Sequence, residues 1–102
     1  MVTGRVIGVC GVMPIYGVDT GEAFAIFKGR ASEHPGAMLS MRLHFPEICR
    51  PWHRVQALVN LYAPESIRFS QWIGMRPEAV IYESGPNKET FVMYVTVRGI
   101  DR

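Results

Sequence analysis

The stretch from residue 44 to residue 54 holds residue types that could bind a metal ion or stack on a nucleotide. His44, Cys49 and His53 carry the nitrogen and sulfur donors that zinc accepts. Their spacing crosses Pro46 and Pro51 and matches no common zinc pattern. We therefore expect no metal site here.

A basic and aromatic cluster overlaps the same stretch. It consists of Arg50, Trp52, His53 and Arg54, residue types that can stack on bases and neutralise phosphates. In a chain with a net charge of only +2, one such cluster is more typical of a linker packed on the core. We expect neither nucleic acid nor a membrane among the partners.

Length and composition indicate one soluble domain over residues 1–102. The chain is 48% hydrophobic, which is enough for a core. No apolar run has the length of a membrane span, and the N-terminus lacks the pattern of a signal peptide. Cys10 and Cys49 fit the reduced thiols of a cytosolic protein better than a disulfide framework. The expected location is the cytoplasm.

The apolar pattern of the first half predicts two strands and a helix. Residues 5–13 are apolar at nearly every position, which is typical of a strand in the middle of a sheet, and residues 22–28 return as its antiparallel neighbour. A helix is expected from residue 35, with Ser32 as a possible cap. Pro46 should stop or kink it, so that it reaches Phe45.

The second half predicts a third strand, a second helix and a hairpin. Residues 53–61 alternate as a strand that can lie parallel to the second, because the helix between them is long enough for a crossover. Pro64 begins the next helix and Gly74 closes it. Strands over residues 79–84 and 90–98 flank a Gly-Pro-Asn-Lys turn. The fold class is therefore α+β, with a central mixed sheet and two helices.

This order of elements and the run from Val55 to Gly99 resemble the GNAT acyl-CoA N-acetyltransferase superfamily. The triplet Ile73-Gly74-Met75 closes a helix, and a Gly-Pro turn precedes the last strand. The chain is similar in particular to small GNAT-like proteins of tailed phages, including internal virion proteins of short-tailed phages, which share an Ile-Arg-Phe pattern. The resemblance covers the later two-thirds of the fold and lacks the strand, two helices and strand that usually come first.

The resemblance implies an acetyl-CoA site between the second and third strands. The pantetheine arm would pair with the backbone of the second strand, and the pyrophosphate would lie on amides that begin the following helix. The positions that it assigns to the cofactor are Phe24, Ile26, Lys28, Arg30, Gly36, Ala37 and Met38. The loop from Arg30 to Gly36 differs in length and glycine content from the family's phosphate loop, and these residues also suit an ordinary loop and helix start.

Two catalytic positions follow from the same resemblance. Glu22 lies near where some members place a general base, although a solvated carboxylate at a strand end has the same sequence signature. Ser70 stands where the family often has a tyrosine as general acid, and a serine hydroxyl is shorter and a poorer acid. If the protein is active, Glu22 would relay a proton while a neutral amine attacks the thioester.

Two functions stay open. One is an acetyl-CoA-dependent N-acetyltransferase of phage type that acts on an amine acceptor. The other is a catalytically inactive structural or interaction module, such as a phage virion protein, which the absent front part, the altered loop and Ser70 favour. Either function leaves an apolar edge on the first strand, which predicts self-association as a homo-oligomer, another covering chain, or a shortened relative.

Overall fold

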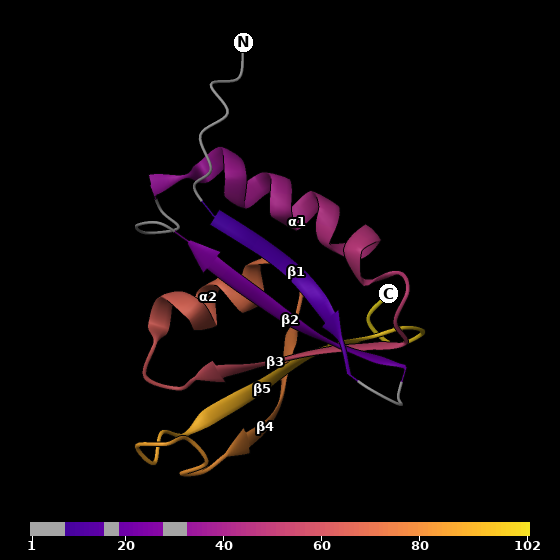
Figure 1. Ribbon diagram of the computed structural model, residues 1–102. Coiled ribbons are helices and arrows are strands. Elements are labelled where there is room, and N and C mark those ends of the chain that lie inside the picture. The colour runs from indigo at the N-terminus through magenta and orange to yellow at the C-terminus, as the bar shows by residue number, and fades with distance from the viewer. Residues whose placement is uncertain (1–7, 16–18, 28–32) are drawn as a thin grey trace.

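The structure, a computed structural model, describes residues 8–15, 19–27 and 33–102. Within them the chain forms one mixed sheet with two helices (Figure 1). The elements in chain order are β1 (Gly8–Pro14), β2 (Thr20–Phe27), α1 (Pro35–Cys49), β3 (Arg54–Asn60), α2 (Pro64–Trp72), β4 (Arg76–Ile81) and β5 (Phe91–Val97). The predicted α+β class and the predicted order of elements are confirmed.

The strands follow the order β1-β2-β3-β5-β4 across the sheet. Strands β2 and β3 are parallel, as predicted, and the remaining neighbours are antiparallel. The first strand was expected in the middle of the sheet, but among the strands that the structure describes β1 lies at one edge. An apolar run indicates which side chains of a strand are buried, and it does not indicate whether both backbone edges of that strand are paired.

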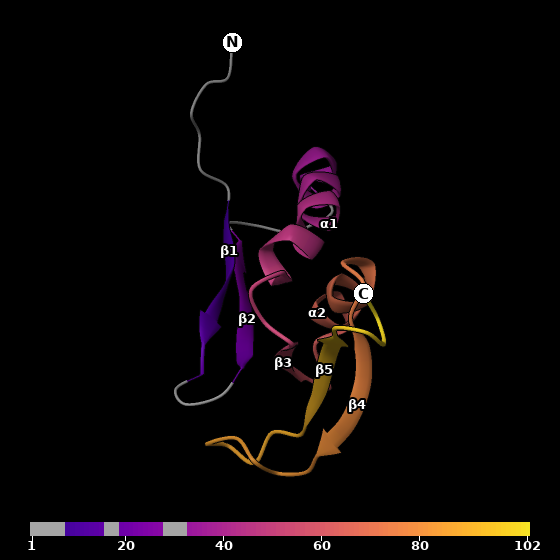
Figure 2. The ribbon, with the colours of Figure 1, turned by 90° about the vertical axis from the view of Figure 1, so that its right-hand side faces the viewer.

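Both helices cover the same face of the sheet. In Figure 2 α1 lies above α2, and both helices lie to the right of β1 and β2. The core cluster of buried residues is Phe45, Cys49, Val55, Val59, Met75, Val92 and Tyr94. Ile67 and Ile73, from α2 and its end, pack against the same cluster as Phe45 of α1. One core therefore lies between the helix pair and the central strands.

Helix α1 runs past the proline that was expected to end it. It continues to Cys49 with Pro46 inside, so the predicted end at Phe45 is wrong by one turn. Proline removes one backbone donor, but the extra turn buries Cys49 completely, and this burial offsets the lost hydrogen bond. The residue at the N-cap position is His34, and the expected cap Ser32 lies outside the described residues.

An ion pair covers part of the face that has no helix. The guanidinium group of Arg54 on β3 donates to both carboxylate oxygens of Glu78 on β4, at 2.8 and 2.5 Å. Because β5 lies between these two strands, the bridge must cross it. Val95 of β5, which faces Gln56 next to Arg54, is 0% exposed although it lies outside the core cluster. The salt bridge thus shields an apolar residue from water.

We expect this bridge to make stability depend on pH. The hydrogen bond from Arg54 lowers the pKa of Glu78, so the carboxylate stabilises the fold above its unfolded pKa and loses this effect as pH falls through the folded one. Glu78→Gln should lower the free energy of unfolding at pH 7, and its difference from the wild type should shrink below about pH 4. Urea unfolding at both pH values measures the difference.

The control for this experiment is Glu47→Gln. Glu47 pairs with Arg50 within one exposed helical turn, where both side chains are more than half exposed, and such pairs contribute little. This variant should stay close to the wild type at both pH values. An equal loss of stability by Glu78→Gln at neutral and acidic pH would contradict the proposed role of the charge.

Candidate functional site

The parallel strands β2 and β3 separate soon after they meet. Their pairing covers only three residue pairs, from Thr20 with Arg54 to Glu22 with Gln56. Beyond this point β2 stays paired with β1, and β3 stays paired with β5, so the two strands diverge (Figure 1). The facing backbone edges of residues 23–27 and 57–60 have no described strand between them. Such edges offer N–H and C=O groups to an extended ligand.

The paired end of the two strands is closed by an aromatic ring. Gly21 pairs with Val55 at this point, and a Cβ atom on Gly21 would lie 2.9 Å from a ring carbon of Trp52. The absence of a side chain therefore lets the ring of Trp52 pack directly on β2. This contact forms the apex of the wedge.

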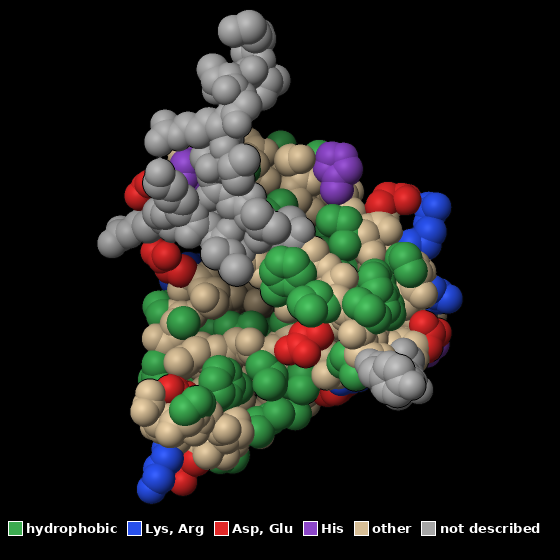
Figure 3. Space-filling view, in the orientation of Figure 1, with side chains coloured by type: hydrophobic (Ala, Val, Ile, Leu, Met, Phe, Trp, Pro, Cys, Tyr) green, Lys and Arg blue, Asp and Glu red, His purple; other side chains and the backbone are tan. Residues whose placement is uncertain are grey.

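A cleft of about 610 Å³ occupies the open part of the wedge. Its strand side includes the small residues Ala23, Ala25 and Ala57, and both helices contribute to the other walls. Figure 3 shows the surface hollowed between the ends of β2 and β3. Because alanine side chains do not fill the space under the helices, the cleft remains open along the exposed strand edges.

The two predicted catalytic residues line this one cleft. Glu22 is exposed and lies at the last paired position, where the wedge begins. Ser70, on α2, is only 5% exposed, and its hydroxyl donates to the backbone oxygen of Ser66 at 2.9 Å. The structure thus brings both residues to the wedge, with the Ser70 proton already engaged in the helix.

Sequence reasoning missed three polar residues of the cleft. Asn60, Glu65 and Ser66 lie at the end of β3 and the start of α2, and all line the wedge. The turn from β3 into α2, marked by Pro64, was the available signal, because chain segments that follow a diverging strand end at its open mouth. Their carboxylate, amide and hydroxyl groups make the far wall of the cleft polar.

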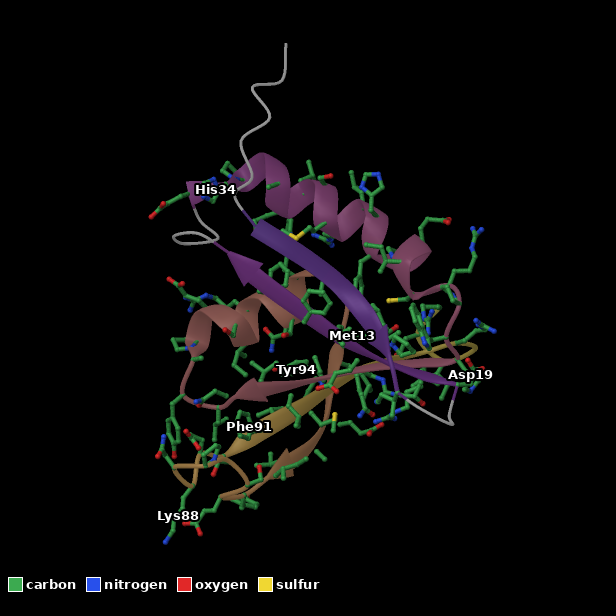
Figure 4. All side chains as sticks on the ribbon, in the orientation of Figure 1. Met13, Asp19, His34, Lys88, Phe91 and Tyr94 are labelled. Carbon is green, nitrogen blue, oxygen red and sulfur yellow. The ribbon has the colours of Figure 1, made fainter. Side chains whose placement is uncertain are left out.

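The predicted phosphate-binding amides lie in the first turn of α1. Gly36 and Ala37 have no intrahelical carbonyl partner at these positions, and the helix dipole is positive there. The third predicted amide, that of Met38, already donates to the oxygen of His34 at 3.0 Å. Figure 4 shows His34 at the start of α1. Two amides thus remain directed out of the helix.

The other predicted cofactor positions are described only in part. Phe24 lines the cleft and is 38% exposed. Ile26 belongs to β2, where its backbone follows the open edge, while its side chain lies outside the described residues. Lys28 and Arg30 also lie outside them.

A second hollow of about 570 Å³ lies between the start of α1 and α2. It shares Glu65 and Phe69 with the wedge, so the two hollows adjoin. Trp72 forms part of its wall and donates its indole N–H to the oxygen of Met38 at 3.2 Å. The guanidinium of Arg42 lies 4.2 Å from the centre of the Trp72 ring. Together the hollows connect the wedge to the first turn of α1.

The basic and aromatic cluster is a linker packed on the domain. Trp52 packs against the core, and Arg54 is paired with Glu78. The guanidinium of Arg102 donates to the backbone oxygens of Cys49, Trp52 and His53 at 2.7, 3.0 and 3.2 Å. The connection between α1 and β3 is therefore held by a residue at the far end of the sequence.

Two further features concern ligands and membranes. In residues 8–15, 19–27 and 33–102, no three His, Cys, Asp or Glu side chains are grouped so that they could hold a metal ion. Among the same residues, neither helix has the length and apolar character needed to cross a membrane.

Comparison with known proteins gives matches in structure only. No family model matches the sequence, and no curated protein matches it. An acetyltransferase of the GNAT family from Bacillus anthracis shares 20% identity, with a TM-score of 0.68 over 90% of this chain and 58% of that one. A chimera of the spermidine N-acetyltransferase SpeG from Vibrio cholerae and hSSAT shares 13% identity, with a TM-score of 0.72 over 91% of this chain and 60% of that one.

Two further solved structures extend the same likeness. The ribosomal-protein-S5-alanine acetyltransferase from Vibrio fischeri shares 11% identity, with a TM-score of 0.67 over 96% of this chain and 57% of that one. The NatC complex bound to Gag peptide and CoA shares 12%, with a TM-score of 0.66 over 89% and 60%. The chain thus spans about three-fifths of the length of these proteins. The likeness establishes that this chain has the fold of the GNAT acetyltransferases.

Proposed function

We propose that the protein is an acyl-CoA-dependent N-acyltransferase that holds its thioester in the wedge between β2 and β3. The observation that carries this proposal is the end of parallel pairing after Glu22, which leaves two facing backbone edges beside a cleft of about 610 Å³. An extended arm that contains amides can form strand-like hydrogen bonds to such an edge. The structural likeness to acetyltransferases, one of them bound to CoA, supports acetyl-CoA as the cofactor.

The cofactor would follow the path formed by the two hollows. We assign its pantetheine arm to the β2 edge at Phe24 and Ile26, and its pyrophosphate to the amides of Gly36 and Ala37. Lys28 and Arg30 would add positive charge next to the phosphates, as the family resemblance implies. Met38 would contribute through the wall of the second hollow, since its amide is used within the helix.

Acetyl-CoA, when bound, supplies an activated acyl group, and the residues of the chain handle the acceptor. We propose an amine as acceptor, which must lose its proton before it attacks. Glu22 is exposed at the wall of the cleft and can accept that proton. Ser70 can rotate its hydroxyl from the oxygen of Ser66 towards the cleft, but the proton for the leaving thiolate would come from water.

A second candidate function is a catalytically inactive module of the same fold, such as a phage virion protein. The engagement of the Ser70 hydroxyl within α2 favours it. So does the carboxylate of Glu65, which lines both hollows along the path of an anionic cofactor. In this case the location would be the virion, and in the first case the cytoplasm of the host cell. Both functions are compatible with another strand on the outer edge of β1.

Calorimetric titration with acetyl-CoA tests the site directly. Wild-type protein should bind in the micromolar range, and Gly36→Glu should weaken binding at least about tenfold by placing a negative charge beside the phosphates. A Cβ atom at Gly36 would meet nothing within 4 Å, so the substitution should not disturb packing. Gly36→Gln is the matched neutral control and should change affinity less than about threefold.

The titration separates the two candidate functions. Folded wild-type protein that binds no acetyl-CoA would refute the cofactor site and favour the inactive module. If Gly36→Glu and Gly36→Gln weaken acetyl-CoA binding equally, the phosphates do not lie at the start of α1, because an effect of charge requires a difference between the two variants.

The role of Glu22 is tested in an assay of acyl transfer from acetyl-CoA to spermidine. The free thiol of CoA that the reaction releases measures its rate. Glu22→Gln should lower kcat at least about 100-fold near neutral pH, because an amide cannot accept the proton. The difference in kcat between this variant and the wild type should become smaller at high pH, where the amine is already neutral in solution. Acetyl-CoA binding should persist, and Glu83→Gln, in the exposed turn after β4, should keep wild-type activity. A pH-independent loss would make Glu22 structural.

A further inference from the structure

The wedge has small side chains on the face of the sheet that the helices cover. Ala23 of β2 and Ala57 of β3 pack against the core cluster, which lies on this face. Ala25 is two positions beyond Ala23, so its side chain is on the same face, and it lines the cleft and is exposed. Because a methyl group does not extend far from the strand, the space between these strands and the helices is only partly filled.

A stripe of apolar residues on helix α1 lies on the other side of this space. Met41, Phe45 and Ile48 line the cleft at steps of three and four residues, so they share one side of the helix. From Met41 to Ile48 this stripe extends for about 10 Å along the helix axis. We call the space the apolar subsite, and its walls are Ala23, Ala25, Ala57, Met41, Phe45 and Ile48.

An arm bound to the open edge of β2 does not fill the apolar subsite. The backbone N–H and C=O groups of a strand lie in the plane of its sheet, so an arm that bonds to them lies in that plane, about 4.8 Å from β2. The alanine methyl groups and the α1 stripe are above the plane, on the side of the helices (Figure 2). The subsite is therefore available to a group other than the arm.

We propose that the apolar subsite holds the hydrocarbon chain of an acyl group longer than acetyl, such as hexanoyl. This inference rests on the proposed acyl-CoA site between β2 and β3. The thioester would lie near Glu22, where the arm reaches the paired end of the strands. Trp52 closes this end against Gly21, so a longer chain turns under the helices. An extended hexanoyl chain is shorter than the stripe on α1.

Charge separates the subsite from the side on which an amine would enter. Among the described residues of the cleft wall, the charged ones are Glu22 and Glu65. Glu22 alternates with Ala23 along β2, so its side chain lies on the face without helices, and Glu65 is in the first turn of α2. The hydroxyl of Ser70 already donates within α2. The subsite therefore suits hydrocarbon, and the acceptor and the acyl chain occupy different faces.

Calorimetric titration with CoA thioesters of two chain lengths tests the subsite. Wild-type protein should bind hexanoyl-CoA at least about tenfold more tightly than acetyl-CoA, because each methylene group that leaves water strengthens binding by up to about fourfold. In Ala25→Leu the two dissociation constants should differ by less than about threefold, because leucine fills the space of the chain. Ala79→Leu, at an exposed position of β4, is the matched control and should keep the wild-type preference.

A second measurement needs no substitution. In wild-type protein labelled at its alanine methyl groups, hexanoyl-CoA should shift the NMR signals of Ala23, Ala25 and Ala57 further than acetyl-CoA does. Identical spectra with the two thioesters would overturn the proposal, even if Ala25→Leu failed to fold. Circular dichroism checks the folding of both variants.

The outcomes distinguish this inference from the proposed function. Equal affinity of the wild type for acetyl-CoA and hexanoyl-CoA would overturn the apolar subsite alone and leave the acyl-CoA site in place. Folded protein that binds neither thioester would refute both. A preference for hexanoyl-CoA that persists undiminished in Ala25→Leu would also overturn the proposal, because the chain would then lie on another surface.

Discussion

The structure depends on where the pairing of two parallel strands ends. Three pairs of residues join β2 to β3, and then each strand follows its antiparallel neighbour instead. A longer parallel ladder would fill the wedge with backbone hydrogen bonds and leave no space for a ligand. The separation is possible because both strands keep a full ladder on their other side. The unpaired N–H and C=O groups along the two open edges border the cleft, where water or a ligand can satisfy them.

Side-chain size and the two helices keep this separation open. Alanines on both strands leave space under the helices, while the larger core residues Phe45 and Val59 form part of the wall of the same cleft. At the apex, Trp52 packs on Gly21 and closes the sheet. The same domain thus combines a packed core with a cleft of about 610 Å³, and the two share some of their residues.

Local signals in the sequence predicted the elements, their order and the parallel crossover. Gly74, for example, was expected to close α2, and its φ angle of 104° is in the region that favours glycine. The position of β1 at an edge was not predictable from its apolar run, since pairing is a property of the assembled sheet. The end of α1 depended on how deeply Cys49 is buried, which outweighed the local effect of Pro46.

For the site, the sequence identified Glu22 and Ser70 through a family resemblance, and both residues line the cleft. It did not identify Asn60, Glu65 or Ser66, because their meeting with β2 depends on the angle between diverging strands. No periodicity or composition encodes that angle. The Ser70 hydrogen bond to Ser66 likewise follows from the helical backbone, and a hydroxyl at this spacing can equally well face solvent.

The contacts of Arg102 have a consequence for the order of folding. Its guanidinium holds the connection between α1 and β3 through backbone oxygens that are 49 to 53 positions earlier in the chain. Contacts over such a separation carry a loop-closure cost in entropy, which is lower once the intervening chain has folded. We therefore expect the hydrogen bonds that hold the apex beside Trp52 to form after the last strand has docked. The cleft between β2 and β3 would be completed late, when the C-terminal residues reach the connection that they hold.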